Sequence, residues 1–419
     1  MGFLLLFYDM ARSASLYQFG PFQLDPAEHR LLRGGVEVGL QLKAFEILCL
    51  LVENAGRLIK KEDLLARIWP DTVVEENNLN KNVSLLRKAL GESATGQAYI
   101  ETVPRVGYRF VAAVSEIGSR QVKPAEASGA LASTPRQKIQ FCTTRDGVRL
   151  AYSSAGSGYP LVKSANWLNH LDYEWDSPLW KHWLAEMTKH HRLVRYDERG
   201  NGLSQWDVKE MSLELWVQDL ETVVEAAGVE KFALLGISQG GAVAISYAIR
   251  HPERVSHLIL LGAFSRGLSV RGTEKQIAGR RALQTLIRLD WGKNNPDFKS
   301  MFTNFYIPHN STPEQQQWFN DLQRISASPE NAARIMITLD EINVRDVLPK
   351  VSVPTLVFHG DRDRVIPAEE GRILAAEIPG ARFVPLSTGN HILLADEPAW
   401  QVFLEELGAF LGWQNAQAG

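Results

Sequence analysis

The sequence predicts a two-domain protein, in which a small α+β domain is followed by a larger α/β domain with a doubly wound, mostly parallel sheet. The chain has 419 residues, which is more than one domain usually holds. Residues 119–137 are rich in Ala, Ser and Pro and nearly free of large apolar side chains, as is typical of a linker. After this segment, short apolar runs alternate with helical stretches, which indicates a parallel sheet covered by helices.

Composition excludes several classes of protein. The chain carries 45 basic and 48 acidic residues, a net charge of −3, so it is not a polybasic nucleic-acid-binding protein. With 45% hydrophobic and 22% charged residues it resembles an ordinary globular protein. Its two cysteines, Cys49 and Cys142, exclude a disulfide framework and favour a cytoplasmic location. The longest early apolar run, residues 3–8, is too short to span a membrane, so we expect no membrane partner.

The small domain begins with short alternating strands and continues with three helices and a hairpin. We expect strands at residues 17–19, 22–24, 30–32 and 36–40, helices at 42–53, 61–69 and 76–90, and a hairpin over 99–114. The third helix carries an apolar stripe at helical spacing, formed by Leu79, Val83, Leu86 and Leu90. Three helices followed by a hairpin is the layout of a winged helix-turn-helix.

Residues 17–115 resemble the OmpR/PhoB-type DNA-binding domain, most closely its CadC-like branch. The resemblance is carried by Asn78-Leu79, by the Leu-Arg-Lys-Ala-Leu run that ends at Leu90, and by the Tyr-Ile-Glu-Thr-Val-Pro-Arg-Val-Gly-Tyr-Arg-Phe motif that ends at Phe110. It implies that the third helix enters the major groove and the wing reaches a minor groove. The implied contacts are Asn78, Lys81, Asn82 and Ser84 to bases or the groove floor, Arg87, Lys88 and Thr102 to phosphates, and Arg105 to the minor groove.

The charges of this segment agree with a modest DNA-binding surface. Between Asn78 and Phe110, five basic residues stand against two acidic ones, a local charge of +3. We therefore expect weak non-specific binding and a need for dimers or tandem sites. A polar helix face is also the ordinary state of a surface helix, so a protein-interaction module is the alternative. The expected partners are double-stranded DNA, RNA polymerase and a second copy of the chain.

In the larger domain, the segment Gly236-Ile237-Ser238-Gln239-Gly240 lies between an apolar strand and a helix rich in small residues. A serine at such an elbow is held in a strained turn with its hydroxyl exposed above the sheet. Asp363 and His391 each follow a later predicted strand, in the chain order that this arrangement uses. A serine hydroxyl needs an imidazole to take its proton and a carboxylate to orient the imidazole, so these residues are candidates for a catalytic triad.

Residues 138–414 resemble the α/β-hydrolase superfamily, specifically its non-haem haloperoxidase and esterase-like branch. The elbow, the His359-to-Asp363 and Gly389-to-His391 motifs and the Asp-Glu-Arg-Gly-Asn-Gly-Leu-Ser loop that begins at Asp197 carry the resemblance. In that family the acid stands three residues after a glycine, which implies Asp363 rather than Asp361. We expect no metal and no cofactor, because no His/Cys spacing typical of a metal site occurs. The remaining histidines that lie near these segments are expected to be structural: His170, His182, His190, His191 and His359.

One departure from the family concerns the oxyanion hole. The family usually has His-Gly after the third strand, but here the segment ends Ser-Ala-Asn166-Trp167. We expect one donor from the backbone N–H of Gln239 and a second from Asn166 or Trp167. Loss of one such donor lowers the rate about 100–1000-fold, so the site is either a slow enzyme or a binding pocket with a retained triad.

The sequence therefore predicts a winged helix at 17–115, a flexible linker at 116–137 and an α/β-hydrolase domain at 138–414, with a helical lid at about 266–350. The resulting hypothesis is a DNA-binding transcriptional regulator whose second domain binds, and in one version hydrolyses, a small ester, lactone or amide by carboxylic-ester hydrolase chemistry. Two alternatives stay open. One is a serine hydrolase whose winged helix localises it or binds proteins. The other is a catalytically inactive, ligand-sensing regulator.

Overall fold

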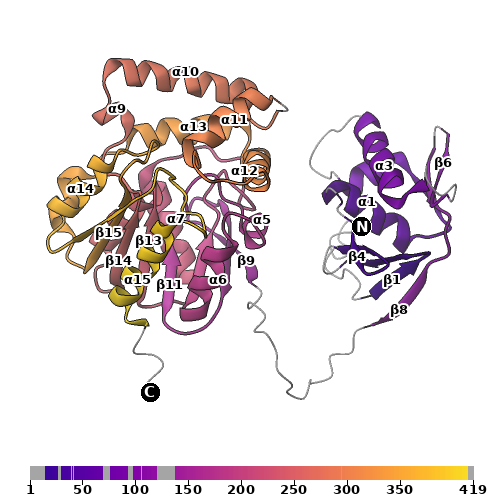
Figure 1. Ribbon diagram of the computed structural model, residues 1–419, viewed down its shortest axis with the longest axis horizontal. Helices are drawn as coiled ribbons and strands as arrows, with labels where there is room; N and C mark the ends of the chain where they lie inside the picture. Colours follow the sequence, from indigo (N-terminus) through magenta and orange to yellow (C-terminus); the bar gives the residue numbers. More distant parts are fainter. Residues whose placement is uncertain are drawn as a thin grey trace. The chain divides into compact units, whose positions relative to one another are not determined.

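The computed structural model describes residues 15–26, 30–38, 40, 42–68, 76–92, 98–104, 106–119, 137–293 and 295–413. The chain divides into two compact units between Gly129 and Ala130, and each unit has its own hydrophobic core (Figure 1). Most of the predicted linker, residues 120–136, lies outside the described residues.

Among its described residues, the smaller unit combines three helices with two antiparallel sheets (Figure 1). The helices are α1 (Leu42–Glu53), α2 (Lys61–Ile68) and α3 (Glu76–Leu90). One sheet has the order β4-β3-β2-β1-β8, with β1 (Ser15–Phe19), β2 (Phe22–Asp25), β3 (Arg30–Arg33), β4 (Val36–Glu37) and β8 (Ser115–Ser119). The other has the order β5-β7-β6, with β5 (Leu58–Lys60), β6 (Ile100–Val103) and β7 (Gly107–Phe110). The arrangement is that of a winged helix.

Two short strands of this unit were not predicted. Strand β8 pairs antiparallel with β1, with Glu116 opposite Tyr17, so the linker begins later than residue 116. Strand β5 pairs with the wing strand β7 and buries only Ile59. A three-residue strand with one buried side chain carries too weak an alternation to be recognised in a sequence. The close approach of β5 requires a glycine at position 107, because a Cβ there would lie 1.9 Å from the Ile59 carbonyl oxygen.

The larger unit is built on a sheet of eight strands in the order β16-β15-β14-β13-β11-β12-β10-β9. The strands are β9 (Lys138–Thr143), β10 (Arg149–Ala155), β11 (Pro160–Lys163), β12 (Arg192–Tyr196), β13 (Phe232–Ile237), β14 (Val255–Leu261), β15 (Thr355–Gly360) and β16 (Arg382–Leu386). All pairs from β12 through β11 to β16 are parallel, while β10 is antiparallel to its neighbours. The predicted doubly wound, mostly parallel sheet is confirmed.

Helices flank this sheet, and a further group lies across one end of it (Figure 1). The flanking helices are α5 (Leu171–Trp175), α6 (Lys181–His190), α7 (Leu213–Ala226), α8 (Gly240–Arg250), α14 (Ala368–Glu377) and α15 (Pro398–Leu411). The second group is called the lid here and consists of α9 (Leu268–Arg271), α10 (Glu274–Asp290), α11 (Pro296–Tyr306), α12 (Pro313–Ser326) and α13 (Pro329–Glu341). The 3-10 helix η1 (Arg345–Lys350) leads from the lid to β15. Among the described helices, none has the length and hydropathy needed to cross a bilayer.

Helix α8 packs unusually close to the sheet because small residues line the contact. A Cβ on Gly236 would lie 2.6 Å from the Gly241 Cα, and a Cβ on Gly241 would lie 2.3 Å from the Ala263 Cβ. Both distances are too short for real atoms. The glycines therefore fix the crossing of β13 and α8, between which Ser238 lies.

Gly241→Ala should destabilise the larger unit by about 1–3 kcal/mol, because the new methyl group has no space beside Ala263. Urea unfolding of the whole chain measures this. Gly279→Ala is the matched control: Gly279 lies inside α10 with no atom within 4 Å of an added Cβ, so the change should stabilise by about 0.5–1 kcal/mol. Equal effects at the two positions would contradict the packing argument.

Candidate functional site

Ser238 occupies a strained turn between β13 and α8. Its φ is +52°, a left-handed conformation that residues other than glycine seldom adopt. Its backbone N–H donates to the Leu261 carbonyl at 2.9 Å, and its carbonyl accepts from Gly241 N at 3.0 Å. These bonds and the close helix crossing hold the strained turn. The residue is half-buried and lies at the carboxyl end of a central parallel strand, where α/β sheets place their ligands.

His391 and Asp363 form a buried pair. The His391 Nδ1 lies 2.6 Å from the Asp363 Oδ2, and both side chains are almost fully buried. The other oxygen, Asp363 Oδ1, accepts from the backbone N–H groups of Val365 and Ile366 at 2.8 and 3.1 Å. Burial alone would raise the pKa of Asp363, but the charge and hydrogen bond of His391 outweigh it, so the pKa is lowered. The carboxylate is therefore kept ionised beside the imidazole.

The second ring nitrogen, His391 Nε2, is buried and has no hydrogen-bond partner among the described residues. The ring lies against Gly262, the residue after β14, where a Cβ would be 3.1 Å from the His391 Cε1. The Ser238 backbone N–H donates to Leu261, the last residue of β14, so the serine and the imidazole both lie at this end of β14. Asp361, the alternative acid, is exposed, and its Oδ1 lies 3.7 Å from Arg362 Nε.

The lid contacts this site through α11. The Tyr306 carbonyl accepts the backbone N–H of His391 at 2.8 Å, and the two rings lie 5.8 Å apart. Tyr306 continues into an aromatic cluster in which Trp167 stacks on Trp291 at 5.6 Å and meets Phe302 edge-on. These rings are buried. They form part of the hydrophobic core beneath the lid.

The segment expected to complete the oxyanion hole is held by side chains. The Trp167 backbone N–H donates to Gln239 Oε1 at 3.0 Å, so this expected donor is already engaged. The Asn166 side chain accepts from Lys163 Nζ at 2.6 Å and donates to the Trp167 carbonyl at 3.0 Å. The backbone N–H of Gln239 belongs to the first turn of α8, whose N–H groups have no intrahelical partner.

The Asp197–Ser204 loop holds this segment, a role that was not predicted from the sequence. Asp197 accepts from the Asn169 side chain at 2.8 Å and from the backbone of Leu203 at 2.7 Å. Glu198 accepts from Gln239 Nε2 at 2.7 Å. Burial raises the pKa of Asp197 to about 7 and that of Glu198 to about 8, and hydrogen bonds limit both shifts. An acidic pair directly after a buried strand was the available signal.

The histidines expected to be structural lie apart from Ser238 or bond to the backbone. His170 caps α5 by accepting the Tyr173 N–H, and His182 Nε2 lies 3.2 Å from the Leu393 carbonyl. His190 stacks on Trp413, and the His191 Nε2 accepts the Trp413 indole N–H. His359, in contrast, lies beside the candidate acid. It is buried, and its Nε2 lies 3.9 Å from Asp363 Oδ2 and 3.0 Å from the Ile366 carbonyl oxygen.

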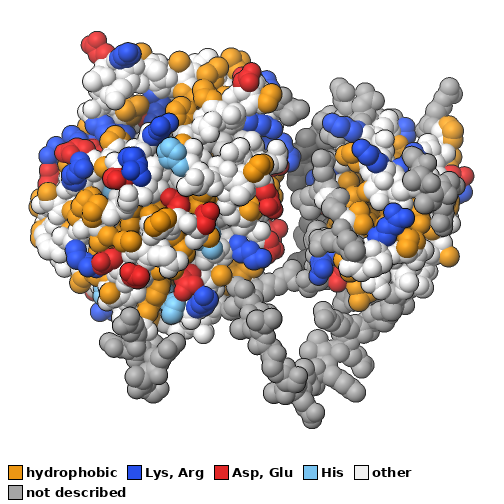
Figure 2. All heavy atoms as spheres, viewed as in Figure 1, with side chains coloured by type: hydrophobic (Ala, Val, Ile, Leu, Met, Phe, Trp, Pro, Cys, Tyr) orange, Lys and Arg blue, Asp and Glu red, His pale blue; other side chains and the backbone are white. Residues whose placement is uncertain are grey.

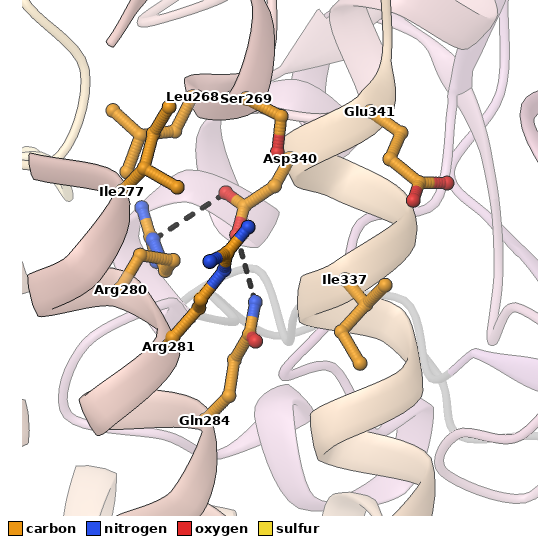
Figure 3. Close-up of a pocket in the computed structure, with 9 residues that line it drawn as sticks. All are labelled: Leu268, Ser269, Ile277, Arg280, Arg281, Gln284, Ile337, Asp340 and Glu341. Carbon is orange, nitrogen blue, oxygen red and sulfur yellow. Dashed lines mark hydrogen bonds and ion pairs between the residues drawn. The ribbon is translucent and has the colours of Figure 1, made fainter. Parts of the chain in front are cut away.

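A cavity of about 220 Å³ lies within the lid, between α9, α10 and α13 (Figure 3). Figure 3 shows Arg280 and Gln284 of α10 both pointing toward Asp340 of α13, at 3.4 and 3.0 Å. Its lining includes none of the three triad candidates. These contacts tie α10 and α13 together.

In the smaller unit, the predicted DNA-contacting residues of α3 differ in their exposure to solvent. Lys81, Ser84 and Lys88 are exposed. Asn82 is only 7% exposed, because it lies on the flank of the helix that turns toward the buried Leu79 and Leu86. Asn82 therefore offers less surface to a base than Lys81 and Ser84 do, and its contact with DNA stays a prediction.

Arg87 and Thr102, both expected at phosphates, bond to each other. The Arg87 guanidinium donates to Thr102 Oγ1 and to the Ile100 carbonyl, each at 2.7 Å, and lies 3.3 Å from Glu92. Arg87 therefore joins the helix to the wing. The side chain of Asn78, and Arg105 as a whole, lie outside the described residues. On the face seen in Figure 2, exposed charged side chains of the smaller unit are mostly Lys and Arg.

Comparisons with known proteins match both units. A family model described as alpha/beta hydrolase fold matches residues 168–398, more than half of the chain. A second, described as transcriptional regulatory protein, C terminal, matches residues 35–110. The chain therefore belongs to the α/β-hydrolase fold family, and its smaller unit is an OmpR/PhoB-type DNA-binding domain.

The similar proteins cover the larger unit. The AB hydrolase superfamily protein YisY of Bacillus subtilis (strain 168) is 27% identical over 60% of this chain and 91% of its own length. The 2-hydroxymuconate semialdehyde hydrolase of Pseudomonas sp. (strain CF600) is 27% identical over 65% of this chain and 93% of its own length. Among solved structures, the esterase EaEST from Exiguobacterium antarcticum has a TM-score of 0.55 at 27% identity, covering 65% of this chain and 98% of the esterase.

The raised pKa of Glu198 predicts a pH-dependent stability. Between the ordinary glutamate pKa and about 8, the folded protein binds a proton that the unfolded chain has released, so stability falls as the pH rises. Glu198→Gln cannot titrate, and its free energy of unfolding should therefore gain on that of the wild type by up to about 1.4 kcal/mol per pH unit from pH 5 to 8. Urea unfolding across this range measures the difference.

The control for this titration is Glu210→Gln, at an exposed position in the same unit. Its unfolding free energy should run parallel to that of the wild type at every pH. Parallel behaviour of Glu198→Gln as well would show that Glu198 titrates as an exposed carboxyl group does.

Proposed function

We propose that the protein is a transcriptional regulator whose hydrolase unit binds and hydrolyses a small ester, lactone or amide through Ser238, His391 and Asp363. The observation that carries the proposal is the geometry of the pair beside the elbow. His391 is oriented by Asp363 at 2.6 Å, its Nε2 has no partner among the described residues, and the strained Ser238 lies at the adjoining strand end. Hydrolases and esterases among the similar proteins support the reaction class.

In this mechanism, His391 Nε2 takes the hydroxyl proton as Ser238 Oγ attacks the carbonyl carbon of the substrate. Asp363 stays ionised and stabilises the imidazolium, and the Gln239 backbone N–H donates to the developing oxyanion. His391 then gives the proton to the leaving alcohol or amine, which departs and leaves an acyl group on Ser238. A water molecule activated by His391 releases the acid and restores the serine.

A second candidate function is supported by one specific contact. Because the Trp167 N–H is engaged by Gln239, one of the donors expected for the oxyanion hole is already occupied. A site that lacks a donor favours binding over turnover, so a ligand sensor without hydrolysis is the alternative. In either case the ligand can alter DNA binding only if it binds two states of the protein with different affinity.

Treatment with a fluorophosphonate probe should add one adduct to the wild-type chain and none to Ser238→Ala, as measured by intact mass. The probe reacts only with a serine whose proton can be taken, so His391→Ala should also stay unlabelled. Ser246→Ala, at a serine of α8 that donates to the Ala242 carbonyl, is the matched control and should label like wild type. An adduct that persists in Ser238→Ala would place the nucleophile elsewhere, and no wild-type adduct would favour the sensor.

Lys81→Ala should weaken binding to the DNA upstream of the protein's own gene several-fold and reduce the slope of affinity against salt by about 1, because one phosphate or base contact is lost. Gel shift at several salt concentrations measures both quantities. The control is Lys209→Ala, an exposed lysine of the hydrolase unit. Equal binding by both variants would favour a protein-interaction role for the winged helix. Repeating the assay with phosphonylated Ser238 tests whether occupancy of the site changes DNA affinity.

A further inference from the structure

The side chain of Gln239 bridges two elements around the candidate site. Gln239 immediately follows Ser238 and is fully buried. Its carbonyl oxygen accepts the Trp167 N–H at 3.0 Å, and its amide nitrogen donates to Glu198 at 2.7 Å. Only the oxygen of an amide can accept from an N–H, so the orientation of the amide is fixed by the chemistry of its neighbours.

This contact competes with catalysis. The segment that ends at Trp167 follows strand β11, beside β13, and one of its backbone N–H groups is expected as the second donor to the oxyanion. An N–H group forms its strong hydrogen bond along one direction. An acceptor that lies on that direction, as Gln239 Oε1 does, therefore excludes a substrate oxygen from the same donor.

We propose that the Gln239 side chain caps the oxyanion hole, so that the Trp167 N–H becomes available to a substrate only when this side chain moves away. The inference rests on the proposed chemistry at Ser238. In the capped state, of the Gln239 and Trp167 backbone N–H groups, only that of Gln239 can donate to the oxyanion. The same residue thus contributes a catalytic N–H from its backbone and blocks the second donor with its side chain.

Glu198 holds the cap in place. Glu198 is 2% exposed, and its Oε1 also accepts from Asn201 Nδ2 at 3.0 Å, which fixes the side chain from the other side. The Trp167 segment is anchored separately, through Lys163 to Asn166 and through Asn169 to Asp197. Glu198 and the Trp167 segment are each anchored by further hydrogen bonds. Release therefore occurs by rotation of the Gln239 side chain and not by movement of the segment.

Gln239→Met tests the cap, because methionine has a similar length and volume, keeps the backbone N–H and cannot accept the Trp167 hydrogen bond. We expect kcat for a p-nitrophenyl ester to rise at least tenfold and phosphonylation of Ser238 to become faster, since a second donor changes such rates about 100–1000-fold. Gln323→Met is the matched control: Gln323 is a buried lid glutamine whose amide atoms have no hydrogen-bond partner among the described residues, and its loss should leave both rates unchanged.

The outcomes separate the two proposals. If the wild type is labelled at Ser238 and Gln239→Met reacts at the same rate or more slowly, the side chain positions the loop and the cap is overturned. If neither protein is labelled, both the cap and the proposed hydrolysis fail. If Gln239→Met does not fold, Glu198→Gln serves instead. The glutamine in this variant has one carbonyl oxygen for two donors, Gln239 Nε2 and Asn201 Nδ2. The variant should therefore loosen the cap and raise the rate of Ser238 phosphonylation by a smaller factor. An unchanged or lower rate would overturn the cap.

Discussion

The arrangement of the larger unit depends on how closely helix α8 crosses strand β13. The missing side chains of Gly236 and Gly241 allow backbone contacts that any Cβ would prevent. This close crossing forces the intervening Ser238 to a φ of +52°, which costs about 1–3 kcal/mol that the surrounding packing must offset. The same crossing places the first turn of α8 beside the serine. One packing constraint therefore accounts for both the strained turn that carries the Ser238 hydroxyl and the adjacent backbone N–H of Gln239.

Around this crossing, buried polar side chains hold the segment that follows β11. The Asp197–Ser204 loop accepts hydrogen bonds from three directions, and Arg199 anchors it to Asp219 through two bonds of 2.8 and 2.6 Å. Buried charges are tolerated only when they are paired and fully bonded. This loop therefore acts as a rigid support, and the segment that ends at Trp167 takes its shape from side chains instead of from a flexible backbone.

The triad candidates could be named from the sequence because each stands in a short motif that follows a predicted strand. The Gln239–Glu198 contact could not be found in the same way. It joins residues 41 positions apart, and it depends on the placement of β12 relative to α8. Asn82 shows a different limit. Helical periodicity identifies the apolar stripe of α3 well, but it does not decide whether a polar residue at the edge of that stripe faces solvent or the core. Short edge strands such as β5 carry too few residues for any periodicity.

The hydrogen bond from the His391 backbone to Tyr306 has a consequence for the order of events in a reaction cycle. Tyr306 ends the lid helix α11, while the His391 ring is the proposed base. Any displacement of α11 away from the sheet would break this bond and remove the aromatic ring that packs on the imidazole. In the proposed hydrolysis, a molecule that entered by such a displacement would therefore react only after α11 had returned, so entry and proton transfer would occur in sequence.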